Sequence, residues 1–235
     1  CEHIAFTASP AEIAQDGLDA LVQRYGQHRL EEADVVVALG GDGFMLQTLH
    51  ATQDYQLPVY GMNRGTVGFL MNAYHEDDLM ERLRDAERAE IHPLSMRVTT
   101  MNGEIQTALA INEVSLLRSG PQAAKLRISV DGRVRMDELV CDGALLATPA
   151  GSTAYNYSAH GPILPIDADV FALTALNAFR PRRWRGALLP QKALVKFEVL
   201  QSDKRPVRAD ADSKSFDEVQ SVEITSERSI PHRLL

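Results

Sequence analysis

The feature that most constrains the fold of this chain is an apolar run that ends in a cluster of glycines. Residues 35–39 read Val-Val-Val-Ala-Leu, and residues 40–43 read Gly-Gly-Asp-Gly. β-Branched runs without polar alternation are typical of strands buried on both faces, which occur in parallel sheets covered by helices. Helical spacing over residues 44–52 and a strand pattern over residues 58–62 complete a strand, helix, strand unit. The sequence therefore predicts an α/β N-terminal part with a parallel sheet.

The distribution of charge divides the chain into two parts. The 235 residues carry 24 Lys and Arg against 32 Asp and Glu, a formal net charge of −8. Residues 1–92 hold 6 basic and 16 acidic side chains, whereas residues 93–235 hold 18 and 16, and all five lysines lie in the second part. This asymmetry favours two domains. If the N-terminal part binds phosphates, it has to do so without lysine, through backbone amides and a metal cation.

The texture of the sequence also changes near residue 93. Helices are expected from Ser9 to Tyr25 and over residues 75–90, and a strand over residues 4–7. Beyond residue 93, alternating patterns predict short strands at 96–99, 105–111, 114–117, 126–130, 134–140, 194–200, 206–209 and 219–225. We therefore expect a Rossmann-like α/β domain over residues 1–92 and a β-rich, mainly antiparallel domain over residues 93–235, whose last residues are candidates for a return to the first domain.

Asp42 is the distinctive residue of the first glycine loop. Glycines permit close backbone approach, and the N-terminus of the following helix directs free N–H groups at an anion. The loop lacks the Gly-Lys-Ser/Thr of a Walker motif and the spacing of a dinucleotide fingerprint. A carboxylate here would repel phosphate unless it accepts a proton from an attacking hydroxyl or holds a divalent metal. The tetrapeptide alone does not decide between such a role and a simple helix cap at Phe44.

A second glycine loop, residues 61–70, follows the next predicted strand. The carboxyl ends of successive parallel strands lie on one edge of a sheet, where open α/β sheets bind ligands. Ordinary strand-to-helix turns are the alternative. We expect the phosphate-binding loops to include Gly40, Gly41, Gly43, Gly65 and Gly68.

Two further segments combine polar side chains with tight turns. Asn112 and Glu113 follow a predicted strand, where an amide and a carboxylate can read sugar hydroxyls or a base edge. A satisfied turn at a strand end is the alternative. Residues 142–147 lead into Thr-Pro-Ala-Gly-Ser-Thr-Ala-Tyr at 148–155, where small hydroxyl residues begin a helix that ends at Gly161-Pro162 and leaves room for a flat ring. A well-capped helix alone would explain Ser152 or Thr153.

Together these motifs resemble the NAD kinase family. They occur in the order of that family and span most of the chain, and the Thr-Pro-Ala-Gly-Ser-Thr-Ala-Tyr segment is specific to it. Gly-Gly-Asp-Gly alone is shared with diacylglycerol kinases, sphingosine kinases and 6-phosphofructokinases. The resemblance implies ATP-dependent phosphorylation of the adenosine-ribose 2′-hydroxyl of NAD to give NADP, with Mg²⁺ or another divalent cation and with no metal ligand assigned.

The resemblance also implies residue roles. Asp42 would be the proton acceptor, in a homodimer or homotetramer in which Asp142 acts across a subunit interface. His160 and Ala150 depart from the family's usual glycine and threonine, and the ambiguous register of residues 207–212 leaves Asp210 and Asp212 without a role. The residues implied in NAD binding are Asp42, Gly43, Asn112, Glu113, Asp142, Ala150, Thr153, Ala154, Tyr155, Asn156, Tyr157 and Ser158.

Other function classes have weaker support. No apolar run approaches the ~18 residues of a membrane-spanning helix, and Cys1 and Cys141 are too few for a disulfide framework, so a cytoplasmic protein without membrane partners is expected. The cluster over residues 180–185, with Trp184, suggests nucleic-acid binding, but the acidic chain favours a surface or subunit contact instead.

Two alternative functions remain. One is a lipid or sugar kinase with the same glycine loop, which the absence of a basic amphipathic helix disfavours. The other is a dinucleotide-binding sensor without catalysis. The sequence does not choose between ATP and polyphosphate as the donor, or between NAD and NADH as the acceptor.

Overall fold

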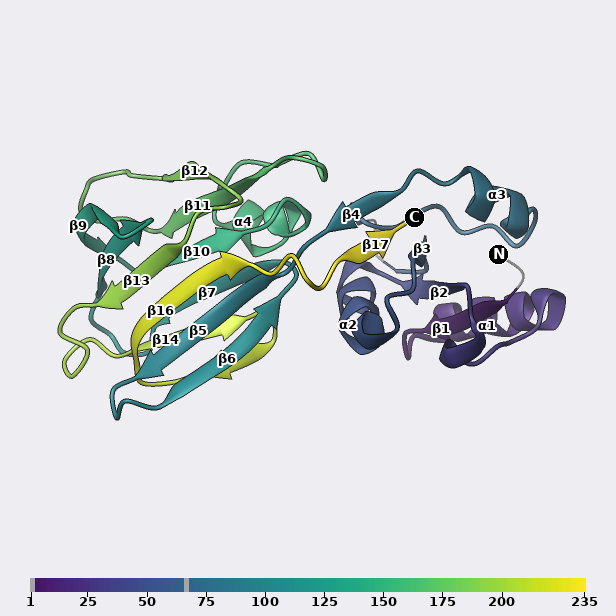
Figure 1. The fold of residues 1–235 in the computed structure, drawn as a ribbon, viewed down its shortest axis with the longest axis horizontal. Helices are drawn as coiled ribbons and strands as arrows, with labels where there is room; N and C mark the ends of the chain where they lie inside the picture. Colours follow the sequence, from purple (N-terminus) through teal and green to yellow (C-terminus); the bar gives the residue numbers. More distant parts are fainter. Residues whose placement is uncertain (1–2, 66–67) are drawn as a thin grey trace. The chain divides into compact units, whose positions relative to one another are not determined.

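The computed structural model describes residues 3–65 and 68–235 and divides the chain into two compact units (Figure 1). The N-terminal unit runs to Ile91 and includes Ser229–Leu235, and the C-terminal unit is His92–Arg228. The division thus falls one residue before the expected boundary, and the end of the chain belongs to the first unit. Within the described ranges, every helix is too short or too polar to cross a bilayer.

The N-terminal unit is built on a five-stranded sheet in the order β1-β2-β3-β17-β4. The first four of these strands are parallel neighbours, and β4 is antiparallel to β17. Every residue of β2 is buried, as expected for a strand covered on both faces. The predicted parallel α/β domain is confirmed. The elements are β1 (Ile4–Ala8), α1 (Glu12–Tyr25), β2 (Val35–Gly40), α2 (Asp42–Thr52), β3 (Val59–Asn63), α3 (Leu79–Asp85), β4 (Ala89–Ile91) and β17 (His232–Leu234).

The register of this sheet places the two glycine loops together. Gly40, the last residue of β2, pairs with Asn63, the last residue of β3. The chain therefore leaves both strands at the same level of the carboxyl edge. This is the edge at which open α/β sheets bind ligands.

The C-terminal unit consists of two six-stranded sheets, β12-β11-β10-β7-β14-β15 and β6-β5-β16-β13-β8-β9, whose neighbouring strands are antiparallel. One core of buried side chains from both sheets joins them, including Met96, Leu116 and Phe197. The predicted antiparallel β-rich domain is confirmed. Its strands are β5 (Leu94–Thr100), β6 (Ile105–Ala110), β7 (Glu113–Arg118), β8 (Ala124–Val130), β9 (Arg133–Cys141), β10 (Gly143–Ala147), β11 (Val170–Leu176), β12 (Gly186–Pro190), β13 (Val195–Val199), β14 (Val207–Ala211), β15 (Lys214–Phe216) and β16 (Val219–Ser226).

Two predicted helices are shorter than expected. The helix over residues 75–90 is only α3, because residues 89–91 form β4 against β17, a partner from the far end of the chain. The helix expected after residue 150 is a 3-10 turn at Ala150–Thr153 followed by the single turn α4 (Tyr155–Ser158). Ala154, with a ψ of −126°, interrupts them. Cys1 and two residues of the second glycine loop, Thr66 and Val67, lie outside the described residues.

Candidate functional site

The carboxylate of Asp42 connects the two glycine loops. Helix α2 begins at Asp42, and its N-cap is Gly41, without a side-chain cap. Oδ2 of Asp42 instead accepts a hydrogen bond from the backbone N–H of Phe69 at 2.9 Å, and Oδ1 accepts one from Leu70 at 3.1 Å. The interpretation of Asp42 as a helix cap is therefore wrong. Its side chain fixes the second loop against the first.

The two predicted glycines of the second loop differ in their surroundings. A Cβ at Gly68 would lie 2.6 Å from Oδ2 of Asp42, so a side chain there would displace the carboxylate. A Cβ at Gly65 would meet nothing closer than 3.7 Å. The Gly65 N–H donates to Oδ1 of Asn63 at 2.9 Å, and the Arg64 N–H donates to the Gly40 carbonyl at 2.8 Å. Backbone contacts thus hold the loops together, and only Gly68 has to be glycine to accommodate Asp42.

The side chain of Arg64, the arginine of the second loop, is packed against other residues of the N-terminal unit. The Arg64 guanidinium lies over the ring of Tyr74, 3.3 Å from its centroid. Its Nε is buried, and it would lie 3.1 Å from a Cβ placed at Gly17 of α1. Arg64 therefore packs the second loop onto α1, so the backbone amides are the groups of this loop that stay available to an anion.

In the C-terminal unit, Asp212 shapes the turn that carries Asn112 and Glu113. Its carboxylate accepts hydrogen bonds from the backbone N–H groups of Ile111 (2.7 Å), Asn112 (3.0 Å) and Glu113 (3.2 Å). No role was predicted for Asp212, because nothing in the local sequence indicates a contact with residues about 100 positions earlier. The pairing of β14 with β7 brings them together.

The segment that starts at Thr148 packs against the same turn. The Thr148 hydroxyl donates to the Ile111 carbonyl at 2.6 Å and accepts a hydrogen bond from the Gly151 N–H at 3.0 Å. A Cβ at Gly151 would lie 2.6 Å from Cα of Asn112 and closer still to its carbonyl oxygen. Gly151 is therefore required for the close approach of the two backbones.

Two side-chain oxygens of this turn are buried without a partner. Oδ1 of Asn112 and Oε2 of Glu113 are inaccessible to solvent and accept no hydrogen bond from the described residues. Burial, and secondarily the charge of Asp212, raises the pKa of Glu113 to about 8. Burial is also the main cause of the raised pKa of Tyr155, followed by the charge of Glu113. Buried polar atoms are nearly always hydrogen-bonded, so these oxygens are the strongest candidates for ligand contacts in this unit.

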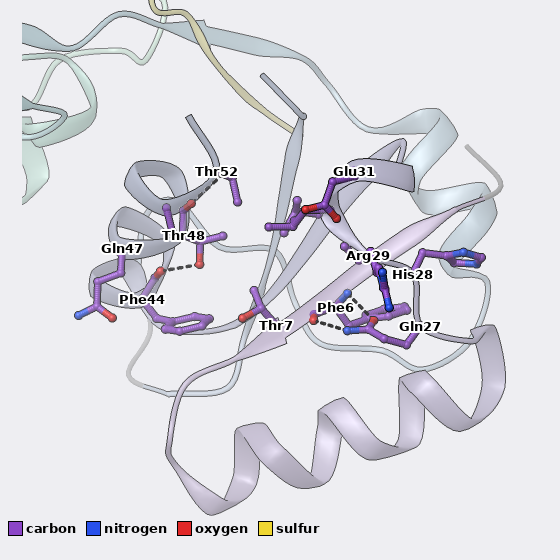
Figure 2. Close-up of a pocket in the computed structure, with 14 residues that line it drawn as sticks. Phe6, Thr7, Gln27, His28, Arg29, Glu31, Phe44, Gln47, Thr48 and Thr52 are labelled. Carbon is purple, nitrogen blue, oxygen red and sulfur yellow. Dashed lines mark hydrogen bonds between the residues drawn. The ribbon is translucent and has the colours of Figure 1, made fainter. Parts of the chain in front are cut away.

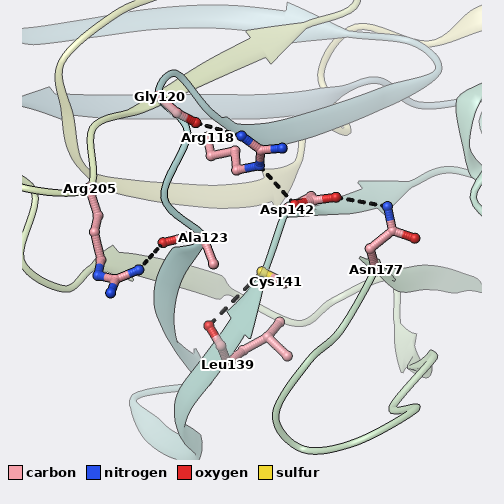
Figure 3. A network of polar contacts seen from close by, with 8 residues as sticks. All are labelled: Arg118, Gly120, Ala123, Leu139, Cys141, Asp142, Asn177 and Arg205. Carbon is pink, nitrogen blue, oxygen red and sulfur yellow. Dashed lines mark hydrogen bonds and ion pairs between the residues drawn. The ribbon is translucent and has the colours of Figure 1, made fainter.

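Asp142 lies in a row of three polar residues at the ends of neighbouring strands (Figure 3). Gly143, the next residue, pairs with Leu117 on β7 and with Leu176 on β11. Arg118 Nε therefore reaches Oδ1 of Asp142 at 2.8 Å, and Asn177 Nδ2 reaches Oδ2 at 2.8 Å. The hydrogen bond from Asn177 is the main cause of the lowered pKa of Asp142, and the hydrogen bond from Arg118 is the second. The carboxylate is thus ionised and held in one orientation.

The predicted residues of the segment 150–158 have different exposures. Thr153, Ala154 and Tyr155 are half-buried, Tyr157 and Ser158 are exposed, and Ala150 is buried. Asn156 is fully buried: its Nδ2 donates to the carbonyls of Ser152 and Pro162, and its Oδ1 accepts from the Thr174 hydroxyl at 2.6 Å. The Asn156 side chain therefore shapes the segment from within, although the sequence analysis placed it among the NAD contacts.

Of two cavities in the structure, one is lined by predicted site residues and the other is not. One, of about 620 Å³, lies in the C-terminal unit and is lined by Asp142, Tyr155 and Ser158 among others. A larger one, of about 690 Å³, lies between β1 and α2 in the N-terminal unit (Figure 2), where the Gln27 amide pairs with the backbone of Phe6. None of the predicted site residues lines the larger cavity. Its volume alone therefore does not make it the site.

Comparison with known proteins is consistent with these features. The chain is 66% identical over 234 residues to the NAD kinase of Cereibacter sphaeroides (strain ATCC 17029 / ATH 2.4.9), covering 100% of this chain and 92% of that protein. It is 61% identical to the NAD kinase of Caulobacter vibrioides, covering 96% and 86% of the two chains.

Two solved structures share the fold. An NAD kinase from Archaeoglobus fulgidus in complex with ATP superposes with a TM-score of 0.79 at 25% identity, covering 99% of this chain and 92% of that one. Yeast NADH kinase complexed with NADH superposes with a TM-score of 0.83 at 19% identity, covering 99% and 82%. The family models for the ATP-NAD kinase N-terminal and C-terminal domains match residues 3–91 and 111–230. The chain therefore belongs to the ATP-NAD kinase family.

Proposed function

We propose that this protein transfers the γ-phosphoryl group of ATP to the 2′-hydroxyl of the adenosine ribose of NAD and so produces NADP. The observation that carries the proposal is the pair of buried oxygens on Asn112 and Glu113, which have no partner among the described residues. Ribose hydroxyls are donors that would satisfy both. The turn that holds these oxygens is fixed by Asp212 and Thr148, so it is preorganised for a ligand.

Asp42 takes the role of proton acceptor in this proposal. Phosphoryl transfer passes through a loose transition state, so catalysis depends on alignment and charge stabilisation more than on covalent chemistry. The N–H groups of Phe69 and Leu70 orient the Asp42 carboxylate, and each of its oxygens keeps a second lone pair for the hydroxyl proton. The amides of the loops containing Gly40, Gly41, Gly43, Gly65 and Gly68 would hold the triphosphate.

We propose that a divalent cation is bound together with ATP. The described ranges contain no group of three or more His, Cys, Asp or Glu side chains able to hold a metal ion. Mg²⁺ is often bound by phosphates and one or two carboxylates rather than by an all-protein cage. Mg²⁺ or another divalent cation would neutralise phosphate charge here, and the loop amides would hold the phosphates that carry it.

We also propose a cytoplasmic homodimer or homotetramer with site residues shared between subunits. Large apolar side chains are exposed on the C-terminal unit, including Phe179 (65%), Leu188 (54%) and Ile163 (52%). Such side chains are typical of surfaces that become buried in an assembly. The Cys141 thiol is free and buried, in keeping with a reducing compartment. Light scattering on the purified protein measures the assembly.

A coupled assay for NADP tests the proposed function. The protein is incubated with NAD or NADH and with Mg-ATP or polyphosphate, and parallel reactions contain lipid and sugar acceptors. NADP formation from NAD and Mg-ATP is the expected result. Phosphorylation of a lipid or sugar alone would support the alternative kinase, and binding of NAD without consumption of ATP would support a dinucleotide sensor.

A further inference from the structure

The cavity that contains Asp142 has a basic wall that no motif predicted. Besides Asp142, Tyr155 and Ser158, it is lined by Arg183, Trp184, Arg185 and His160. The sequence analysis treated this arginine-rich segment as a surface or subunit contact. The structure instead brings part of it to the predicted NAD-binding residues.

Packing fixes the position of this segment. Trp184 is half-buried and packs against the core of the C-terminal unit. The backbone N–H of Trp184 donates to the Pro181 carbonyl at 3.2 Å. The Arg185 carbonyl accepts a hydrogen bond from the backbone N–H of Ala175 in β11 at 3.0 Å. Arg183 has a φ of 62°, in the left-handed region that non-glycine residues rarely adopt. Arg183 and Arg185 are therefore presented by an ordered turn.

The two arginines have no side-chain partner among the described residues. Neither side chain forms a hydrogen bond, an ion pair or a ring contact with the residues of 3–65 and 68–235. Both side chains are exposed. By contrast, Arg118 on the same sheet is paired with Asp142 at 2.8 Å. The cavity is thus lined by two arginines without a partner among the described residues, beside an ionised Asp142 carboxylate that is already paired with Arg118.

We propose that Arg183 and Arg185 bind the diphosphate of NAD, with Trp184 as an apolar wall for an adjacent ring. This inference rests on the proposed function. The diphosphate is the anionic part of NAD, and the planar guanidinium matches phosphate oxygens in two-point hydrogen bonds. Tyr155 connects the cavity with the Asn112-Glu113 turn, because it lines the cavity and the charge of Glu113 contributes, after burial, to its raised pKa.

Variants of three neighbouring arginines test the proposal. Arg183→Ala and Arg185→Ala remove the proposed contacts, and Arg182→Ala is the matched control because Arg182 is exposed and does not line the cavity. Loss of a charge-assisted hydrogen bond to phosphate is expected to weaken NAD binding by ~10-fold or more. KM for NAD should rise in both test variants while kcat changes little, and the control should match the wild type.

Binding without turnover provides a second measurement. Trp184 is the only tryptophan of the sequence, so tryptophan fluorescence reports on this wall of the cavity. NAD and ADP-ribose contain the diphosphate, so both should change the tryptophan fluorescence and bind more weakly to Arg183→Ala and Arg185→Ala. Adenosine lacks the diphosphate, so its affinity, measured by calorimetry, should be the same for the wild type and all variants. Arg183→Lys and Arg185→Lys, which keep the charge, should recover part of the affinity.

The outcomes separate this inference from the proposed function. Equal NAD affinities in the Arg182, Arg183 and Arg185 variants would overturn the assignment of the diphosphate, even with full NADP formation by the wild type. Selective loss of NAD and ADP-ribose binding supports it, even if the wild type makes no NADP. The absence of NADP formation would count against the proposed function alone. Thermal unfolding midpoints equal to the wild type show that the variants are folded.

Discussion

Replacing Gly68 with alanine places a methyl group against the carboxylate of Asp42. The added Cβ would lie 2.6 Å from Oδ2 and closer still to Oδ1. Ordinary van der Waals contact begins at 3.4 Å, so the carboxylate or the loop has to move by about 0.8 Å or more. The movement disturbs the hydrogen bonds from the Phe69 and Leu70 N–H groups, which orient the proton acceptor.

The expected magnitude follows from that displacement. Each hydrogen bond to a charged group contributes ~1.5–3 kcal/mol, and both are at risk. Misplacement of a reacting group by ~1 Å costs ~10²-fold in rate, or ~2.7 kcal/mol in the barrier. We therefore expect Gly68→Ala to lower kcat for NADP formation by ~10²-fold. The fold should persist, because Gly68 is a half-buried loop residue outside the hydrophobic core.

The control for this prediction lies in the same loop. Alanine at Gly65 would meet no atom closer than 3.7 Å, so Gly65→Ala should keep near-wild-type kcat. Steady-state NADP formation is measured for both variants, with circular dichroism to confirm the fold. Equal kcat values for Gly65→Ala and Gly68→Ala would refute the reasoning that Gly68 is glycine because of Asp42.

Three further predictions concern the Asn112-Glu113 turn. The pKa of Glu113 is raised from 4.5 to about 8. Between these two pH values Glu113 is ionised in the unfolded state and protonated in the folded state. The free energy of unfolding should therefore fall as pH rises from about 5 to about 8, by at most ~1.4 kcal/mol per pH unit. Denaturant titrations of the wild type and Glu113→Gln should show a smaller fall in the variant, and parallel pH profiles would contradict the assignment. Asp212→Asn removes the charged acceptor of three backbone N–H groups, so KM for NAD should rise by ~10-fold, and an unchanged KM would show that the turn does not need it. The same variant should lower the pKa of Glu113, measured by carboxyl NMR titration, because Asp212 is its second cause.

Local sequence patterns predicted the elements that position the first half of the site. The buried run of β2 and the glycines after β2 and β3 are sufficient to place two loops at one sheet edge. They were not sufficient to decide the role of Asp42. Its carboxylate contacts backbone groups 27 and 28 residues later, and a tetrapeptide contains no information about them.

The part of the chain after residue 93 was predicted less completely, for a related reason. The run of β11 is apolar apart from Thr174, a pattern that does not distinguish a strand from a buried helix. Strand β17 pairs with β3 and β4 from the opposite end of the sequence, so no local pattern marks it. Asn156 matches the family motif and yet is buried, because Thr174 of β11 satisfies its amide oxygen.

The position of the basic segment, residues 180–185, also could not be predicted from local sequence. Arg183 and Arg185 line a cavity with Asp142 because of the order of β10, β11 and β12 in the sheet, which composition alone does not indicate. The overall acidity of the chain argued only against nucleic acid. The topology of the sheet is what places these arginines beside Asp142.

The central claim is that Asp42 is the proton acceptor in NAD phosphorylation, and one variant tests it most directly. Asp42→Asn keeps the size of the side chain but removes its charge and its basicity. NADP formation from NAD and Mg-ATP is measured alongside NAD binding by calorimetry. We expect Asp42→Asn to fold and to bind NAD but to form no NADP. NADP formation at the wild-type rate would contradict it.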